Sequence, residues 1–159
     1  MARAREVPGL DCEEPFSAAA ARVVEVRSAE VFEQAHDVLD TDDIERLHDM
    51  RVATRRLRAA LEVFAPCFPA KRHRKALKRV KALADALGER RDRDVSIELL
   101  ESFAAGEAPE GDRAAIVTLI ERLRAEQHEA NEALAPFVAP KRLKKLRRRL
   151  RKLTKAARK

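Results

Sequence analysis

The stretch from His48 to Arg58 constrains the fold more than any other part of the chain, because it combines an apolar face with a strongly basic one. In a helix, four of its side chains fall within an arc of roughly 80°: His48, Arg51, Arg55 and Arg58. The apolar positions cluster around the opposite side: Ile44, Met50, Ala53, Leu57, Leu61 and Phe64. Since no carboxylate is spaced to neutralise the arginines, we predict an amphipathic helix with one face in a core and one face shaped for an anion.

The composition favours a single all-α domain. The chain has 159 residues, of which 38% are charged and 45% hydrophobic, with only four glycines. This balance is typical of amphipathic helices and excludes both a disordered chain and a β sandwich. We therefore predict an antiparallel bundle of about six helices over residues 16–159, preceded by a flexible tail over residues 1–15.

Apolar periodicity and helix-ending residues place the six predicted helices. The first spans about Ser17–Leu39, and the second follows the acidic loop Asp40–Asp43 and ends before Pro66. The third spans about Ala70–Leu87, with Gly88 as its terminating residue. The others span about Val95–Ala105, with Asp92 or Asp94 as the cap, about Asp112–Leu134, and Pro140 onward.

The charge distribution indicates a polyanionic partner. The net charge is +7, and the segment Lys141–Lys159 holds twelve Lys and Arg and no acid. Such a surface favours nucleic acid, an anionic membrane or polyphosphate. No apolar run approaches the roughly 20 residues of a membrane span, and the N-terminus lacks an apolar signal core, so we expect a cytoplasmic protein. Cys12 and Cys67 are expected to be reduced and incidental.

Two motifs carry a resemblance to a known family. His48-x-x-Arg51-Val-Ala-Thr-Arg55-Arg56-Leu57-Arg58 is followed, after a Lys/Arg-rich helix, by Leu87-Gly-x-x-Arg91-Asp92-x-Asp94-Val95. This order resembles the CHAD domain, the conserved histidine α-helical domain, and Ala139-Pro-Lys-Arg-Leu143 resembles the opening of the last helix of a half-domain. The resemblance implies an all-helical protein that binds inorganic polyphosphate through basic residues, often on polyphosphate granules.

The chain departs from the usual family pattern in length. Family members usually have two pseudo-symmetric bundles that together form a basic groove, whereas this chain has sequence for one. Either a homodimer rebuilds the pair, or one half binds alone. No Glu-x-Glu-x-Lys pattern occurs, so an attached triphosphate-hydrolysing tunnel domain is not expected.

A phosphate chain also fits the residues themselves. Arginine donates in a planar fork that matches phosphate oxygens, and lysine supplies a mobile ammonium. Charges about one helical turn apart would form a track for a linear polyanion. A bound anion would also favour the protonated, positively charged form of His48, and this effect would increase below neutral pH. The predicted polyphosphate-binding residues are His48, Arg51, Arg55, Arg56, Arg58, Lys71, Arg74, Lys75, Lys78, Arg91, Lys145 and Arg148. We expect Ala at both Arg51 and Arg55 to abolish most of the binding.

Several alternatives remain at this level. The same lysines and arginines could contact the phosphates of a nucleic acid. However, the six aromatic residues are all Phe and several occupy core or turn positions, so stacking platforms for bases are not apparent. The last helix could lie on a membrane surface, but it lacks an aromatic anchor.

An iron site is a further alternative. Two Glu-x-x-His pairs, Glu33 with His36 and Glu45 with His48, are half of a di-iron ligand set that Glu98 or Glu121 could extend. His36, His73 and His128 share no spacing and are expected to be structural or surface residues. With no nucleophile and base pair and no glycine-rich phosphate loop, we expect neither catalysis nor a cofactor or metal.

Overall fold

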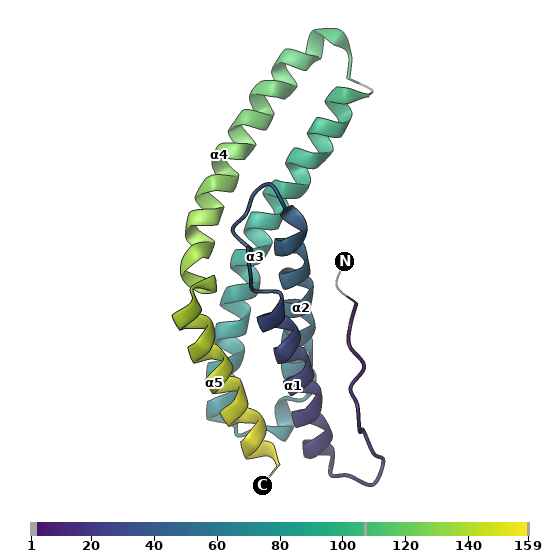
Figure 1. Cartoon of the computed structure of the whole chain (residues 1–159), viewed down its shortest axis with the longest axis vertical. Coiled ribbons are helices and arrows are strands. Elements are labelled where there is room, and N and C mark those ends of the chain that lie inside the picture. The colour runs from purple at the N-terminus through teal and green to yellow at the C-terminus, as the bar shows by residue number, and fades with distance from the viewer. Residues whose placement is uncertain (1–2, 107, 159) are drawn as a thin grey trace.

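Five α-helices make up most of the part of the chain that the structure describes, residues 3–106 and 108–158 of a computed structural model (Figure 1). They are α1 (Phe16–Glu33), α2 (Ile44–Val63), α3 (Ala70–Ala105), α4 (Arg113–Val138) and α5 (Pro140–Ala157), with short 3₁₀ turns at Ala65–Cys67 and Glu110–Asp112. The described residues contain no strand, so the predicted all-α class is confirmed, although the expected six helices are five.

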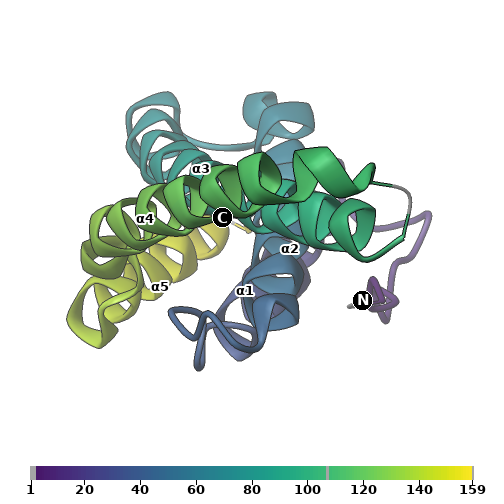
Figure 2. The ribbon, with the colours of Figure 1, turned by 90° about the horizontal axis from the view of Figure 1, so that it is seen from above.

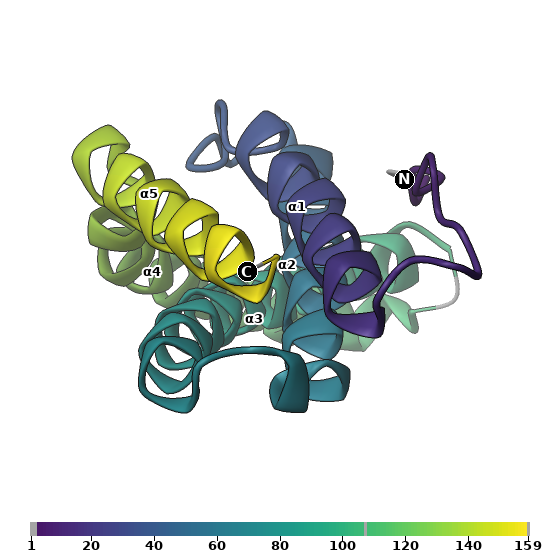
Figure 3. The ribbon, with the colours of Figure 1, turned by 90° about the horizontal axis from the view of Figure 1, so that it is seen from below.

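A four-helix bundle forms the body of the molecule. Seen from below, α1, α2, α5 and the first half of α3 surround a common core (Figure 3). Each contributes side chains that are at most 1% exposed, such as Val24, Leu57, Val80 and Leu150. The predicted apolar face of the second helix is therefore confirmed at its centre, where Met50, Ala53, Leu57 and Leu61 are buried.

The predicted third and fourth helices are one helix, and the predicted ending at Gly88 is wrong. Helix α3 runs unbroken for 36 residues from Ala70 to Ala105. It continues because Leu87, Arg90 and Asp94, on either side of the glycine, all face inward, so packing on α4 outweighs the low helix propensity of Gly88. Asp92 and Asp94 accordingly lie inside the helix and cap nothing.

Gly88 offers a direct test of this continuity. A Cβ atom at Gly88 would meet no described atom within 4 Å apart from its chain neighbours and the backbone of its own helix, so alanine fits without a clash. We expect Gly88→Ala to raise the free energy of unfolding by about 1 kcal/mol, the difference in helix propensity between the two residues. Urea denaturation would measure it, and a loss of stability would show that the helix is interrupted there.

Two other predicted helix ends are also corrected. Helix α1 ends at Glu33 rather than near Leu39, because the chain turns at Asp37, which has a positive φ of 53°. Helix α4 continues past Leu134 and through Pro136 to Val138, since Leu134 and Val138 both pack into the core. Pro140 then occupies the first turn of α5, as predicted.

The far halves of α3 and α4 extend beyond the bundle as a two-helix hairpin (Figure 1). We call residues 95–106 and 108–121 the arm. Seen from above, α3 and α4 run side by side (Figure 2), and their contact is the most extensive in the molecule. A small separate apolar cluster, Ile97, Ala108, Ile116 and Ile120, holds the arm together.

The segment before α1 has no helix within residues 3–15, but it contacts α1. The backbone N–H of Arg5 donates to Glu30 at 2.6 Å, and the Arg27 side chain donates to the Arg5 carbonyl at 2.9 Å. Arg22 and Glu14 form a further ion pair at 2.9 Å. These contacts attach the predicted flexible tail to the surface of the bundle.

Candidate anion-binding cleft

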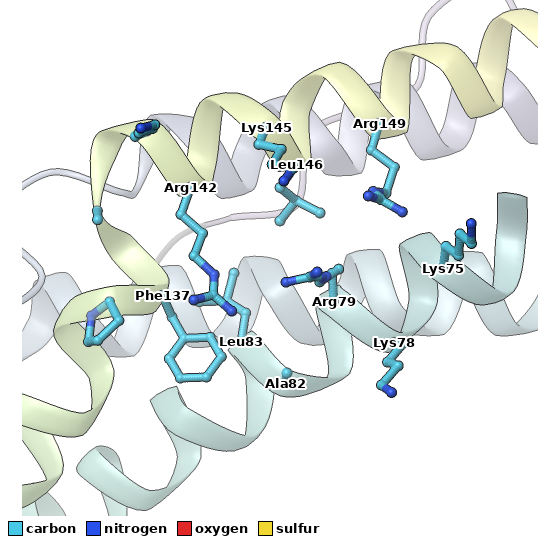
Figure 4. A pocket seen from close by; sticks show the side chains of 13 residues that line it. Lys75, Lys78, Arg79, Ala82, Leu83, Phe137, Arg142, Lys145, Leu146 and Arg149 are labelled. Carbon is cyan, nitrogen blue, oxygen red and sulfur yellow. The ribbon is translucent and has the colours of Figure 1, made fainter.

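A cleft of about 1080 Å³ opens between the first half of α3 and α5 (Figure 4). Its apolar lining comes from Ala82 and Leu83 of α3, from Pro136 and Phe137 at the end of α4, and from Ala139 and Leu146. Lys75 faces Arg149 at one end, and Leu83 faces Arg142 at the other, so the two helices run antiparallel along the cleft (Figure 4).

The polar lining of the cleft is entirely basic among the described residues. Seven of its lining residues are Lys or Arg: Lys75, Lys78, Arg79, Lys141, Arg142, Lys145 and Arg149. Arg79, Arg142 and Arg149 point into the gap, whereas Lys78 points away from α5 (Figure 4). The Arg142 guanidinium lies over the Phe137 ring at 5.0 Å, which fixes its position through a cation–π contact.

Helical spacing produces this concentration of charge. Leu146, Leu150 and Leu153 of α5 are buried, so the basic residues around them form the rims of the helix surface. Arg142 and Arg149 lie one turn on either side of Leu146, and Lys75 and Arg79 lie four residues apart on α3. Two basic helices that share a core therefore present parallel rims of positive charge.

Several charges elsewhere in the molecule are paired. Arg27 and Glu30 lie 2.8 Å apart, Arg158 and Glu25 2.5 Å apart, and Arg124 and Glu101 2.5 Å apart. By contrast, none of the seven cleft lysines and arginines forms an ion pair with any described residue. The cleft thus combines uncompensated positive charge with a concave surface, which strengthens the field on an anion.

The arginine face of α2 is partly neutralised, contrary to the prediction that no carboxylate is placed to do so. Glu62 accepts from Arg58 at 3.2 Å and pairs with Lys81 of α3 at 3.0 Å. The Lys81 hydrogen bond, followed by that of Arg58, holds the pKa of the Glu62 carboxyl below its usual range. Arg51 and Arg55 carry no such ion pair within the described chain.

A family model of the CHAD domain matches residues 22–159, which is most of the chain and includes every cleft residue. The chain belongs to the CHAD domain family. No curated protein matches the chain. None of the described helices is both long enough and apolar enough to cross a membrane.

The predicted binding residues of this CHAD domain fall into three groups. Lys75, Lys78 and Lys145 line the cleft; Lys71 and Arg74 are exposed at the start of α3, and Arg148 is exposed on α5 outside the lining. The remainder lie on α2 or at its level on α3: His48, Arg51, Arg55, Arg56, Arg58 and Arg91. Sequence analysis did not select four further cleft residues: Arg79, Lys141, Arg142 and Arg149. Their helical spacing from Lys75 and Leu146 indicated that they share a helix face with those residues.

His48 and Arg91 are partly buried rather than freely exposed in the CHAD domain. One nitrogen of each, His48 Nδ1 and Arg91 Nη1, is buried without a hydrogen-bond partner among residues 3–106 and 108–158. Glu62 pairs with Lys81, and α3 runs antiparallel to α2, so a rise of about 1.5 Å per residue puts His48 near the level of Val95, about one helical turn beyond Arg91. These two residues therefore lie far along α3 from the end where Lys75 and Arg149 meet.

The most buried charge of the CHAD domain belongs to Arg90, which sequence reasoning did not select. Its Nε donates to Asp94 at 2.9 Å and its Nη1 to Asn131 at 2.7 Å. Gln127 donates to the same Asp94 oxygen at 2.6 Å, and Asn131 donates to the Leu39 carbonyl at 2.8 Å. This network joins α3, α4 and the loop after α1.

One Glu-x-x-His pair of the iron hypothesis, Glu33 with His36, is engaged in other contacts. The His36 Nε2 accepts from Arg46 at 2.7 Å, so its Nδ1 carries the proton that is donated to the Glu33 carbonyl at 2.8 Å. Glu33 pairs with Arg5. In the part of the chain that the structure describes, no three His, Cys, Asp or Glu side chains are grouped to hold a metal ion.

Proposed function

We propose that this CHAD domain binds inorganic polyphosphate in the cleft between α3 and α5, without chemical conversion of the chain. The single observation that supports this most strongly is the set of seven cleft lysines and arginines with no carboxylate among the described lining residues. Polyphosphate carries charge along its length and no bases. The cleft offers forked guanidinium donors, and the ring of Phe137 in its lining is covered by the Arg142 guanidinium and not open to a base. The CHAD family, which is associated with polyphosphate, points to the same ligand.

The proposal includes where the protein acts. A domain that holds a polyphosphate chain without cleaving it is suited to attach itself, or a partner, to polyphosphate in the cytoplasm, including granules of the polymer. Arg51 and Arg55 on α2 would extend the contact for long chains that leave the cleft. A second copy would provide another basic surface for the same long chain, and avidity would then favour long polymers.

Competition between two polyanions tests the proposal. Fluorescently labelled polyphosphate bound to the full chain is titrated with unlabelled polyphosphate or with duplex DNA of matched total charge, at physiological salt. We expect polyphosphate to displace the label at lower concentration than DNA, because the cleft has no residues placed for base edges. Equal displacement would identify a general polyanion binder, including a nucleic-acid binder, and would overturn the assignment.

Salt dependence provides an independent measure of the number of contacts. Each phosphate that a lysine or arginine neutralises releases counterions, so the logarithm of the affinity should fall linearly with the logarithm of salt concentration. We expect a steep slope for the wild type and a shallower slope for any variant that removes cleft charges. A slope that does not change in cleft variants would place the contacts elsewhere on the protein.

Alanine at both Arg51 and Arg55 separates the α2 face from the cleft. We expect this double variant to weaken binding of long polyphosphate several-fold and to leave binding of chains short enough to fit the cleft unchanged, since neither residue lines it. Isothermal titration with short and long chains would measure both affinities. A loss for short chains as large as for long ones would move the primary site to α2, as the sequence alone predicted.

A further inference from the structure

The arm leaves a continuous apolar stripe in water. Val95, Leu99 and Phe103 are 46%, 67% and 40% exposed, and their spacing of four residues places them on one side of α3. Monomeric proteins seldom expose apolar side chains in a contiguous row unless the row meets a partner.

The outer end of the stripe, at Phe103, lies beyond the start of α2, and its inner end lies near the level of the first turns of α2. Leu99 follows Lys81 by about five helical turns and so lies on the same side of α3. Lys81 pairs with Glu62, which shows that this side of α3 faces α2 lower in the bundle. Helix α2 begins at Ile44, and the arm continues beyond the bundle without it (Figure 1).

The arm and the cleft carry opposite charge. Residues 95–121 contain six Asp and Glu and one Arg, a net charge of −5. The cleft contains seven Lys and Arg around an apolar floor that includes Leu83, Phe137 and Leu146. The two surfaces are therefore complementary in charge and in apolar surface. The arm is acidic and carries an apolar stripe, and the cleft is basic and has an apolar floor.

We propose that the arm of one copy docks into the α3–α5 cleft of a second copy. The dimensions agree, since Val95 to Phe103 spans about 12 Å of helix and Arg142 to Arg149 about 10 Å. Leu99 and Phe103 then pack on the apolar floor, and Glu98 meets the basic rims. The contact buries the stripe and brings Glu98 to the cleft lysines and arginines, none of which forms an ion pair within the described part of one chain, whereas Glu101 already pairs with Arg124.

This contact is heterologous, because the stripe and the cleft open on different sides of α3, toward α2 and α5 respectively. Each copy carries one arm and one cleft, so a pair that docks reciprocally is closed, whereas a pair that docks through one arm adds further copies as concentration rises. Because the arm and polyphosphate would occupy the same cleft, polyphosphate dissociates the assembly. This competition rests on the function proposed above, whereas the contact between the two copies does not.

Sedimentation velocity of the full chain over a concentration series tests the contact. The average mass of the wild type is expected to rise with concentration at low salt, and to fall on addition of salt or of polyphosphate. Leu99→Ser with Phe103→Ser is expected to weaken association at least about tenfold by removing apolar contacts. Polyphosphate affinity is expected to be unchanged when it is measured at protein concentrations at which the wild type is monomeric, because the arm then does not occupy the cleft. The matched control is Val117→Ser with Leu119→Ser, which removes exposed apolar groups of α4 and is expected to leave association intact.

The outcomes separate this contact from the proposed function. A wild type that stays monomeric, or that associates equally well after Leu99→Ser with Phe103→Ser, overturns the docked arm. Association that survives Arg142→Glu with Arg149→Glu also overturns it. Association that depends on both arm and cleft, in a protein that does not bind polyphosphate, supports the docked arm and overturns the proposed function alone.

Discussion

Replacing Arg142 and Arg149 with glutamate is expected to weaken polyphosphate binding about 100-fold or more, the largest effect expected of any pair of substitutions. Both guanidinium groups point into the cleft from α5 (Figure 4). Hydrogen bonds to charged groups contribute about 1.5–3 kcal/mol each, and reversing both charges adds repulsion to the loss. Fluorescence anisotropy with labelled polyphosphate at fixed salt would measure the change.

The control for this experiment lies on the same helix. Lys144 and Arg151 have the same seven-residue spacing as Arg142 and Arg149, are exposed, and do not line the cleft. Lys144→Glu with Arg151→Glu changes the net charge by the same amount, so it reports the effect of general electrostatics. If both double variants lose affinity equally, polyphosphate binds the positive field of α5 and not the cleft.

Breaking the buried Arg90–Asp94 pair is expected to destabilise the protein by about 3–5 kcal/mol, because the remaining partner becomes an uncompensated buried charge. Both side chains are fully buried in this pair. Asp94→Ala also removes the acceptor of Gln127, so the contact between α3 and α4 is weakened at two points. The free energy of unfolding, from urea denaturation followed by circular dichroism, would measure the loss.

A hydrophobic replacement of both partners distinguishes charge burial from a requirement for this network. Arg90→Met with Asp94→Leu fills a similar volume and leaves neither partner charge behind, so we expect far less destabilisation than from Asp94→Ala. Asp94→Asn, which keeps the shape, provides a variant that folds if Asp94→Ala does not. Destabilisation by the double variant as large as by Asp94→Ala would show that the hydrogen bonds to Gln127 and Asn131 dominate.

The comparison of Gly88 with Pro136 shows where local sequence signals failed. Both residues are typical of helix ends, and both lie inside helices here. Leu87 and Arg90 on α3, and Leu134 and Val138 on α4, are buried on either side of them. Burial of these neighbours outweighs a propensity cost that concerns one residue, and burial depends on contacts distant in the sequence.

The sequence by itself determined the all-α class, the apolar face of α2, the start of α5 at Pro140, and the family, since these depend on periodicity and on motifs within single segments. It also indicated that the protein is basic and suited to bind a polyanion. Three of the predicted binding residues line the cleft: Lys75, Lys78 and Lys145. Only the tertiary structure decided which basic faces come together. Lysines and arginines on the surface of any helix can be solvated, so their pattern does not reveal that α3 meets α5 across a groove, or that Glu62 neutralises part of α2. The pairing of α3 with α5 is determined by the buried leucines and by the turn between α4 and α5.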